Sequence, residues 1–215
     1  MKKFIAEFLG TFALVFIGAG AVLVNSLTGG ALGLVGIALA HGFVLMTMIY
    51  SFANLSGAHF NPAVTIAMVA TKNIDLKRAA GYILSQLAGA IVAAFLLILL
   101  FPSATPTQIY GFPTEIGLGF GILVEAILTF FLVCTIFGVA LNKKAPAGFF
   151  GLAIGSVLFY DILMGGTQTG AAMNPARAFG PALVSGIWGP QLIYWIGPIV
   201  GALVAALLLQ YLLRE

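Results

Sequence analysis

Charged residues are scarce in this chain. Only 7% of its 215 residues are Asp, Glu, Lys or Arg, whereas 61% are hydrophobic and the mean hydropathy is +1.14. A water-soluble domain needs far more charge on its surface, so the composition excludes one and indicates a membrane protein. The nine basic residues and the net charge of +3 are too few to indicate nucleic-acid binding.

Cysteine and histidine are nearly absent as well. The one cysteine, Cys134, lies in an apolar run, which excludes a disulfide framework, and the only histidines are His41 and His59. No ligand spacing for a metal is present, so we expect neither a metal nor another cofactor. An enzyme is not expected either, because the ionisable residues at membrane depth offer no pair of nucleophile and base: Glu7, His41, Glu125, Asp161 and Arg177.

Long apolar runs fill most of the sequence instead. At roughly 20 residues per crossing, they predict an all-α membrane protein with six spans and one domain, 1–215. The predicted spans are 4–24, 34–53, 79–100, 116–141, 148–164 and 191–213.

A ten-residue phrase occurs twice between these runs. Residues 56–65 read SGAHFNPAVT and residues 169–178 read TGAAMNPARA. In each copy Asn can cap a helix that starts at Pro, which predicts short helices over 62–70 and 175–183. Irregular backbone at membrane depth is tolerated only inside protein or beside a watery cavity, so the phrase marks a pore or a binding site.

The duplication covers the whole chain, with repeats at approximately 1–108 and 113–215. Glu7 matches Glu125 in the first span of each half, and 89–94 (GAIVAA) matches 201–206 (GALVAA). Each half has three full spans, so the second half must enter the membrane from the opposite side and the repeats are inverted.

Positive charge indicates the orientation. Eight of the nine basic residues fall on one side of the six-span scheme, which predicts that both termini are cytoplasmic: Lys2, Lys3, Lys72, Lys77, Arg78, Lys143, Lys144 and Arg214. Arg177 is the exception. The two half-helices then enter from opposite sides and meet near the midplane, with Asn61 and Asn174 at the junction.

With two Asn-Pro-Ala copies, Arg after the second, and a glutamate in spans one and four, the chain resembles the aquaporins, or major intrinsic proteins, over its full length. The resemblance implies a passive pore in each subunit and a homotetramer. It implies that Glu7 and Glu125 brace the re-entrant loops. Its pore motif would be Asn61, Pro62, Ala63, Asn174, Pro175 and Ala176, and its pore-lining carbonyls those of Gly57, Ala58, His59, Gly170, Ala171 and Ala172.

Family spacing places a selectivity filter at His41, Ile162, Ala171 and Arg177. This set resembles that of the tonoplast intrinsic proteins of plants, some of which add a loop histidine that this chain lacks. Two inward helix N-termini would oppose cations and interrupt proton relay. In this filter only His41 and Arg177 could hydrogen-bond a solute, and Asp161 could hold His41 protonated if their side chains met.

We therefore expect a passive channel in the lipid bilayer, in the plasma membrane, for water and also small neutral solutes such as ammonia or hydrogen peroxide, excluding protons and ions. The alternatives are a broader glycerol or urea facilitator and, because Asp161 is an intramembrane acid beside the filter, an ion channel or coupled transporter.

Overall fold

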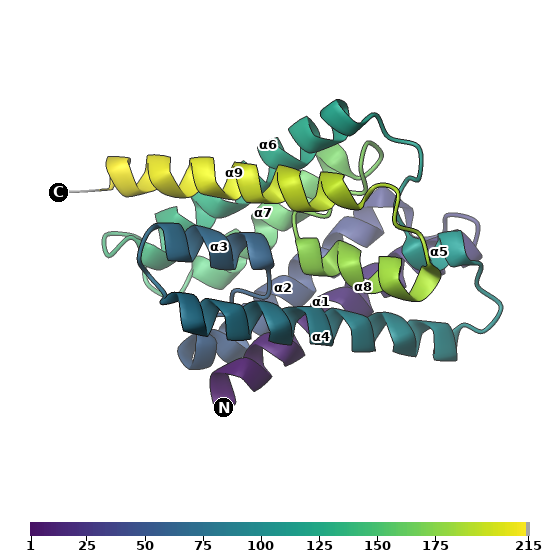
Figure 1. The fold of residues 1–215 in the computed structure, drawn as a ribbon, viewed down its shortest axis with the longest axis horizontal. Coiled ribbons are helices and arrows are strands. Elements are labelled where there is room, and N and C mark those ends of the chain that lie inside the picture. Colours follow the sequence, from purple (N-terminus) through teal and green to yellow (C-terminus); the bar gives the residue numbers. More distant parts are fainter. Residues whose placement is uncertain (214–215) are drawn as a thin grey trace.

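The computed structural model describes residues 1–213 and consists of helices joined by short connections; no strand occurs in that part of the chain. This agrees with the predicted all-α fold (Figure 1). The helices are α1 (Lys2–Leu27), α2 (Gly33–Ser56), α3 (Pro62–Ala70), α4 (Leu76–Leu100), α5 (Pro106–Tyr110), α6 (Leu118–Ile136), the π-helical η1 (Phe137–Leu141), α7 (Phe150–Gly165), α8 (Pro175–Ser185) and α9 (Gln191–Leu212).

Five of the six predicted spans are long and apolar enough to cross a bilayer: α1, α2, α4, α6 with η1, and α9. The fifth in chain order, α7, has 16 residues and is shorter than the others. At a rise of 1.5 Å per residue, α7 spans about 24 Å, less than the hydrocarbon core of about 30 Å. The loop that follows α7 therefore begins at membrane depth, where the second copy of the phrase lies.

The half-helices α3 and α8 begin at the predicted residues. Pro62 and Pro175 occupy their first turns, and Asn61 and Asn174 are their N-caps, in extended conformation with side chains that accept backbone N–H groups. Figure 1 shows α3 and α8 near the centre of the molecule, in one row along its long axis. Each half-helix thus comes from its own repeat. The two start near each other and run in opposite directions.

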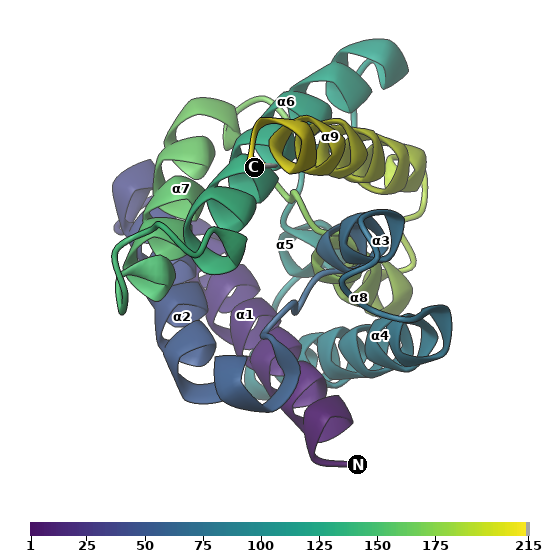
Figure 2. The same cartoon turned by 90° about the vertical axis from the view of Figure 1, so that its left-hand side faces the viewer.

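The long helices surround this pair (Figure 2). Close approach between them depends on glycines that match between the repeats. A Cβ at Gly42 would lie 2.7 Å from the carbonyl oxygen of Gly155, and one at Gly155 would lie 2.6 Å from that of Gly42, so α2 and α7 meet backbone to backbone. The predicted packing role of the Gly and Ala runs is seen at Gly89 against Phe8 and at Gly201 against Ala126.

The start of α1 and the end of α9 lie toward the same end of the long axis, on the left of Figure 1. The connections 71–75 and 142–149 lie at that end too, so the basic residues gather there as expected for an even number of crossings. Arg214 lies outside the described residues.

Two elements were not expected from the sequence. The stretch 101–114, between the predicted spans 79–100 and 116–141, contains α5, which starts with a capping box between Thr105 and Gln108. The predicted span 116–141 changes from α-helix to π-helix at Phe137. A π-helical turn is rare and often lies at a functional site, and here it borders the pore mouth described next.

Candidate pore and filter

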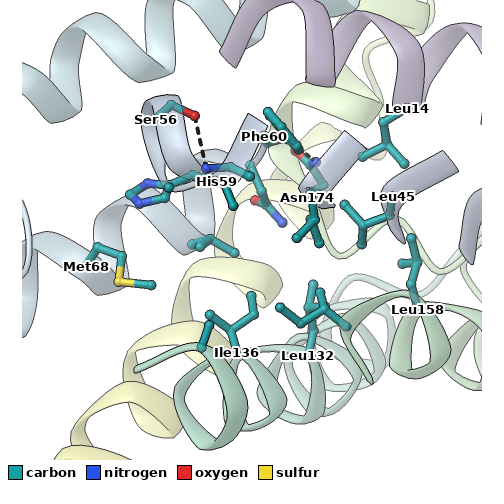
Figure 3. A pocket seen from close by; sticks show the side chains of 18 of the residues that line it. Leu14, Leu45, Ser56, His59, Phe60, Met68, Leu132, Ile136, Leu158 and Asn174 are labelled. Carbon is teal, nitrogen blue, oxygen red and sulfur yellow. Dashed lines mark hydrogen bonds between the residues drawn. The ribbon is translucent and has the colours of Figure 1, made fainter. Parts of the chain in front are cut away.

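A cavity of about 360 Å³ runs beside the two loops. One part of its wall is apolar and comes from long helices: Leu14, Leu45, Ile49, Leu132, Ile136, Ile154 and Leu158. Figure 3 shows Leu132 and Ile136 across the cavity from His59 and Asn174. The two copies of the phrase supply much of the rest of the wall, and Ala140 and Leu141 of η1 extend it toward the end that carries the basic connections.

The two loops share an unusual backbone. Ala58, Phe60, Ala171 and Met173 have positive φ angles of 52°, 49°, 47° and 50°, which residues with a side chain rarely adopt. Each such residue costs of order 1–3 kcal/mol and persists only where its surroundings hold it. The strain occurs at equivalent positions in both repeats, which indicates that the same backbone path is required on both sides.

The carbonyl groups of these loops are mostly free within the protein. Among the described residues, no donor reaches the predicted pore carbonyls, which belong to Gly57, Ala58, His59, Gly170, Ala171 and Ala172. These residues lie in the cavity wall with the exception of Gly170. The two loops therefore supply carbonyl oxygens without a donor to the polar part of the cavity wall.

Glu7 holds the first loop. Its fully buried carboxylate accepts from the backbone N–H groups of His59 (2.9 Å) and Phe60 (2.7 Å). It also accepts from the Ser56 hydroxyl (2.6 Å) and from the amide of Gln86 (2.7 Å). Four donors on one carboxylate fit the bracing role and leave it no part in a proton relay.

Glu125 holds the second loop in the same way but with three donors. It accepts from the N–H groups of Ala172 (2.9 Å) and Met173 (2.6 Å) and from the Thr169 hydroxyl (2.6 Å). Matching tyrosines support both loops: Tyr82 donates to the Ser56 carbonyl and Tyr194 to the Thr169 carbonyl, each at 2.7 Å.

The two asparagines tie the loops to each other. Asn61 Nδ2 donates to the Met173 carbonyl, and Asn174 Nδ2 donates to the Phe60 carbonyl, both at 2.8 Å. An amide nitrogen has two N–H donors, so each asparagine keeps one more. Both side chains border the cavity, so the two remaining donors lie where the half-helices meet.

At the far end of the cavity, His41 and Arg177 are in direct contact. The Arg177 Nε and Nη2 lie 3.3 and 3.1 Å from His41 Nε2, and His41 Nδ1 lies 2.9 Å from the Ile37 carbonyl. A carbonyl requires an N–H on Nδ1 and the guanidinium requires an acceptor at Nε2, so the geometry fits a neutral His41 with both ring nitrogens in use.

This contact revises two expectations about the filter. His41 has no free group to hydrogen-bond a solute, because both its nitrogens already have partners. It is also not held protonated by Asp161, since the group that faces its Nε2 is a guanidinium. Asp161 itself is buried, and its Oδ2 has no partner among the described residues.

Of the predicted filter residues, His41, Ala171 and Arg177 line the cavity. Ile162 is buried one turn after Leu158, which lines the cavity from the same face of α7, and its part in the filter stays a prediction. Gly18 makes room for His41, because a Cβ there would lie 2.5 Å from the imidazole ring.

Several residues at this site were missed from the sequence. Gln86, Tyr82 and Tyr194 each hold a loop, and Phe112 stacks on Arg177 with 4.2 Å between the ring centroid and Cζ. The tyrosines could have been found, because they occupy equivalent positions ahead of the matched GAIVAA and GALVAA runs. Nothing in the sequence pairs Phe112 with Arg177.

His59 also lies at the cavity, on the side of the first loop. Its Nδ1 is 3.1 Å from the Thr65 hydroxyl, and its ring meets that of Tyr82 edge to face. No group of three or more metal-ligating side chains occurs in the part of the chain that the structure describes.

Known proteins resemble this chain in sequence. Residues 1–209 match the model of the family described as "Major intrinsic protein". A "Probable aquaporin TIP-type" from Medicago truncatula is 41% identical, covering 99% of this chain and 87% of that protein. Nodulin-26 from Glycine max is 39% identical over 96% of this chain and 76% of its own length.

The similarity extends to a solved structure. The aquaglyceroporin from Plasmodium falciparum superposes with a TM-score of 0.79 at 31% identity, covering 96% of this chain and 93% of that one. The sequence match, the two braced loops and the shared fold agree, and the chain belongs to the major intrinsic protein family, the aquaporins.

Proposed function

We propose that the cavity is the path of a passive channel for water and small neutral solutes through the membrane. The observation that carries the proposal is the junction of the two loops, where Asn61 and Asn174 each keep a free amide donor beside the cavity. A water molecule there can direct its oxygen to these donors, while the loop carbonyls accept from its hydrogens on either side.

The same junction should exclude ions and protons. Two helices start there, so their positive dipole ends oppose a cation. A water oriented with its oxygen toward both asparagines cannot relay a proton along the file. Arg177 adds a fixed positive charge at the outer end of the cavity. This reasoning disfavours an ion channel or coupled transporter, as does Asp161, which does not belong to the cavity wall formed by the described residues.

The protein is an integral, multi-pass membrane protein. We further propose that it works as a homotetramer in the plasma membrane with both termini cytoplasmic. The gathering of basic residues at one end supports the orientation, and family membership supports the tetramer. In this arrangement α3 enters from the cytoplasm and α8 from outside, and the filter faces the exterior.

Water flux should be tested on proteoliposomes by stopped-flow light scattering, with separate gradients of an impermeant osmolyte, ammonia, urea and glycerol. Osmotic permeability should exceed that of empty liposomes several-fold, with no rise in proton flux. Leu158→Trp is the matched control, because it fills the cavity from a long helix without touching the loop braces. Permeability equal to that of empty liposomes would refute the proposal.

Solute arms of the same experiment separate the alternatives. A water channel with a narrow filter should pass glycerol poorly, whereas a broad facilitator would pass glycerol and urea at rates comparable to water. Ammonia or peroxide flux that disappears together with water flux in Leu158→Trp would place these solutes in the same path.

A further inference from the structure

We propose that a groove between α1 and α4 binds an anionic phospholipid, with the head group at Lys3 and one acyl chain along the groove. The lipid comes from the leaflet at the end of the molecule that carries the basic connections. None of the residues described as lining this groove belongs to the wall of the cavity between the two loops. The inference therefore goes beyond the channel function proposed above and does not depend on it.

The groove is shallow and open, with a volume of about 390 Å³. Each helix lines it with three residues at the same spacing: Phe4, Ile5 and Phe8 from α1, and Leu84, Ser85 and Ala88 from α4. This spacing places the three on one face over a single helical turn, roughly 6 Å long. The Ser85 hydroxyl donates to the Gly81 carbonyl at 2.9 Å. The lining thus offers no free side-chain donor and suits a hydrocarbon chain.

Lys3 connects the groove to the charged end of the two helices. Its Nζ lies 5.4 Å from the centroid of the Phe4 ring, which is part of the lining. The ring is held against α4, because a Cβ at Gly81 would collide with it. The rule that basic residues gather on one side of a membrane explains a lysine at this end, but not a lysine that leans over the groove. An ammonium group in this place lies beside the head group of a lipid whose chain covers Phe4.

Positive charge is in excess where the two helices begin. Helices α1 and α4 pack along each other and start at the same end of the molecule (Figure 1), which brings Lys2, Lys3, Lys77 and Arg78 to one membrane surface. Asp75 carries an opposing charge, but Arg78 engages it through its backbone N–H at 2.8 Å and its Nε at 3.5 Å. Lys3 forms no ion pair within residues 1–213. Its charge is therefore available to a phosphate.

The start of α1 adds backbone donors. No side chain caps this helix, and the N–H groups of Lys2 and Lys3 have no acceptor in the part of the chain that the structure describes. Free N–H groups and the positive end of the helix dipole favour an anion at such a place. A phosphate beside Lys3 could thus accept from both the ammonium group and the backbone.

The second repeat lacks the charges, so the duplicated fold does not require them. Its equivalents of α1 and α4 are α6 and α9, matched through Glu125 and Gly201. The positions that match Lys2, Lys3, Lys77 and Arg78 hold Phe120, Gly121, Gly189 and Pro190. Because the repeats are inverted, that pair of helices begins at the opposite leaflet. The basic residues accompany the groove on one side of the membrane only.

The test is the dissociation constant of the first bound lipid, measured by native mass spectrometry on the full chain in detergent. Phosphatidylglycerol and phosphatidylcholine with identical acyl chains are compared, and phosphatidylglycerol should bind about tenfold more tightly. Lys3→Gln should weaken phosphatidylglycerol binding about fivefold, the contribution expected of one basic residue near an anionic head group. It should leave phosphatidylcholine binding unchanged, and Lys3→Arg should keep the wild-type affinity for both.

Lys143→Gln is the control for net charge. Lys143 lies in the connection between η1 and α7, which Tyr50 ties to α2 by donating to the Gly148 carbonyl, and this variant should weaken binding less than twofold. Ala88→Trp fills the groove and should weaken the binding of both lipids. Val200→Trp, at the matching exposed position of α9, should weaken neither.

Equal affinities for the two lipids would overturn the proposal. Equal losses in Lys3→Gln and Lys143→Gln would overturn it as well, because the attraction would then belong to the surface charge as a whole. If Ala88→Trp disrupted an oligomer and left lipid binding unchanged, the groove would be a contact with a second copy of the chain. Water flux enters none of these measurements, so a failure here is distinguishable from a failure of the channel function.

Discussion

The two re-entrant loops carry out the same task with different means. In both, a buried glutamate accepts two backbone N–H groups and a hydroxyl, a tyrosine supports the loop from a long helix, and an asparagine caps the half-helix. These shared features hold a strained backbone at equivalent positions. The glutamate, the tyrosine and the asparagine recur in both halves because both loops have to be held in the same backbone conformation.

The differences lie in how each loop is reinforced. The first loop has Gln86, whose Nε2 donates to both Glu7 and Thr65. The equivalent position in α9 is Pro198, which has no side-chain donor, and Thr65 is matched by Ala178. The second loop has Arg177 where the first has Val64, and it gains Phe112 from an outside connection.

This comparison suggests a division of labour between the halves. The first loop is tied by a neutral hydrogen-bond network and closes the pore wall on its side. The second loop lacks an equivalent of the Gln86 network and carries the charged residue Arg177. In the filter that we propose, selectivity would depend on the second half, which carries Arg177 and whose loop has fewer internal hydrogen bonds.

Replacing Glu7 or Glu125, which hold the two loops, should have the largest effect on stability and water permeability, and the effect should differ between the two. Glu125→Leu leaves the N–H groups of Ala172 and Met173 without an acceptor, and each buried unsatisfied donor costs about 1–3 kcal/mol. We expect this variant to lose most of its thermal stability and all water permeability. Glu7→Leu should be milder, because the unpaired Oε1 of Gln86 lies beside the same loop and can accept instead.

The measurement is thermal unfolding in detergent, monitored by circular dichroism, together with water flux in proteoliposomes. The double variant Glu7→Leu with Gln86→Leu should then fall to the level of Glu125→Leu. If Glu7→Leu were already the more damaging single change, Gln86 would not be a second support for the first loop.

Cysteines introduced at the two matched alanines should show from which side of the membrane each loop is reached. Ala171 and Ala58 both border the cavity at equivalent places in the two loops. A membrane-impermeant mercurial added outside oriented vesicles or cells should block Ala171→Cys almost completely and leave Ala58→Cys open. The wild-type protein, whose only cysteine is Cys134 on α6 away from the cavity wall, should respond weakly.

Water permeability after external addition is the readout, with reversal by a thiol as the control for specificity. Equal block of the two variants would contradict the opposite orientation of the loops. Strong block of the wild type would mean that Cys134 controls the path.

Replacing Arg177 by the residue of the first loop tests the proposed division. Arg177→Val removes the positive charge and both contacts to His41, and we expect ammonium and other small cations to leak about tenfold faster while water flux changes less than threefold. A desolvated charge near the path is a barrier of this order, since tenfold corresponds to ~1.4 kcal/mol. Unchanged cation exclusion would assign the barrier to the half-helix N-termini alone.

The supporting tyrosines should show a smaller and nearly equal effect. Tyr82→Phe and Tyr194→Phe each delete one hydroxyl that donates to a loop carbonyl at 2.7 Å. A loss of about 1 kcal/mol in unfolding free energy is expected for each. Tyr50→Phe, whose hydroxyl serves the connection before α7 instead of a re-entrant loop, is the control and should leave water flux unchanged.

The smallest effect concerns the helices that follow the half-helices. Asp75 caps α4, whereas α9 has Pro190 at its N-cap position and no side-chain cap. The backbone N–H of Arg78 donates to the Asp75 carboxylate and lowers its pKa below the usual range. Because the folded-state pKa is depressed, the cap stabilises the protein at neutral pH, and this contribution is lost as the pH falls below about 4 toward the folded pKa.

Asp75→Ala should therefore reduce thermal stability slightly at pH 7 and not at pH 3. Asp75→Asn, which can still cap, should be nearly neutral at both values. A difference between wild type and Asp75→Ala that persisted unchanged at pH 3 would contradict the assignment of the pKa shift to the cap.

Much of the architecture followed from the sequence because local rules and the bilayer act on short segments. Apolar length predicted the spans, and the Asn-Pro-Ala copies predicted both half-helices at their observed starts. The bracing glutamates could be inferred from the resemblance and from the expense of a carboxylate in lipid. The π-helical turn at Phe137 was not predicted from the sequence.

The filter shows where sequence reasoning ends. Spacing along the chain placed His41 and Arg177 together in the filter, but it could not show that they are in contact. His41 was therefore expected to hydrogen-bond the solute. In the structure its two ring nitrogens contact the Ile37 carbonyl and Arg177 instead. Leu158 lines the cavity one turn before Ile162, on the same face of α7, and nothing in the sequence singled it out. Phe112 reaches Arg177 only through the path of its connection.

By itself, then, the sequence determined the class of protein, the duplication, the crossing segments and the position of the irregular loops, because each depends on local conformation and on the polarity of the bilayer. The tertiary structure alone decided which donors and acceptors remain free for a solute. Hydrogen bonds and stacking between residues far apart in the chain depend on orientations within a few tenths of an ångström, which no spacing along a sequence specifies.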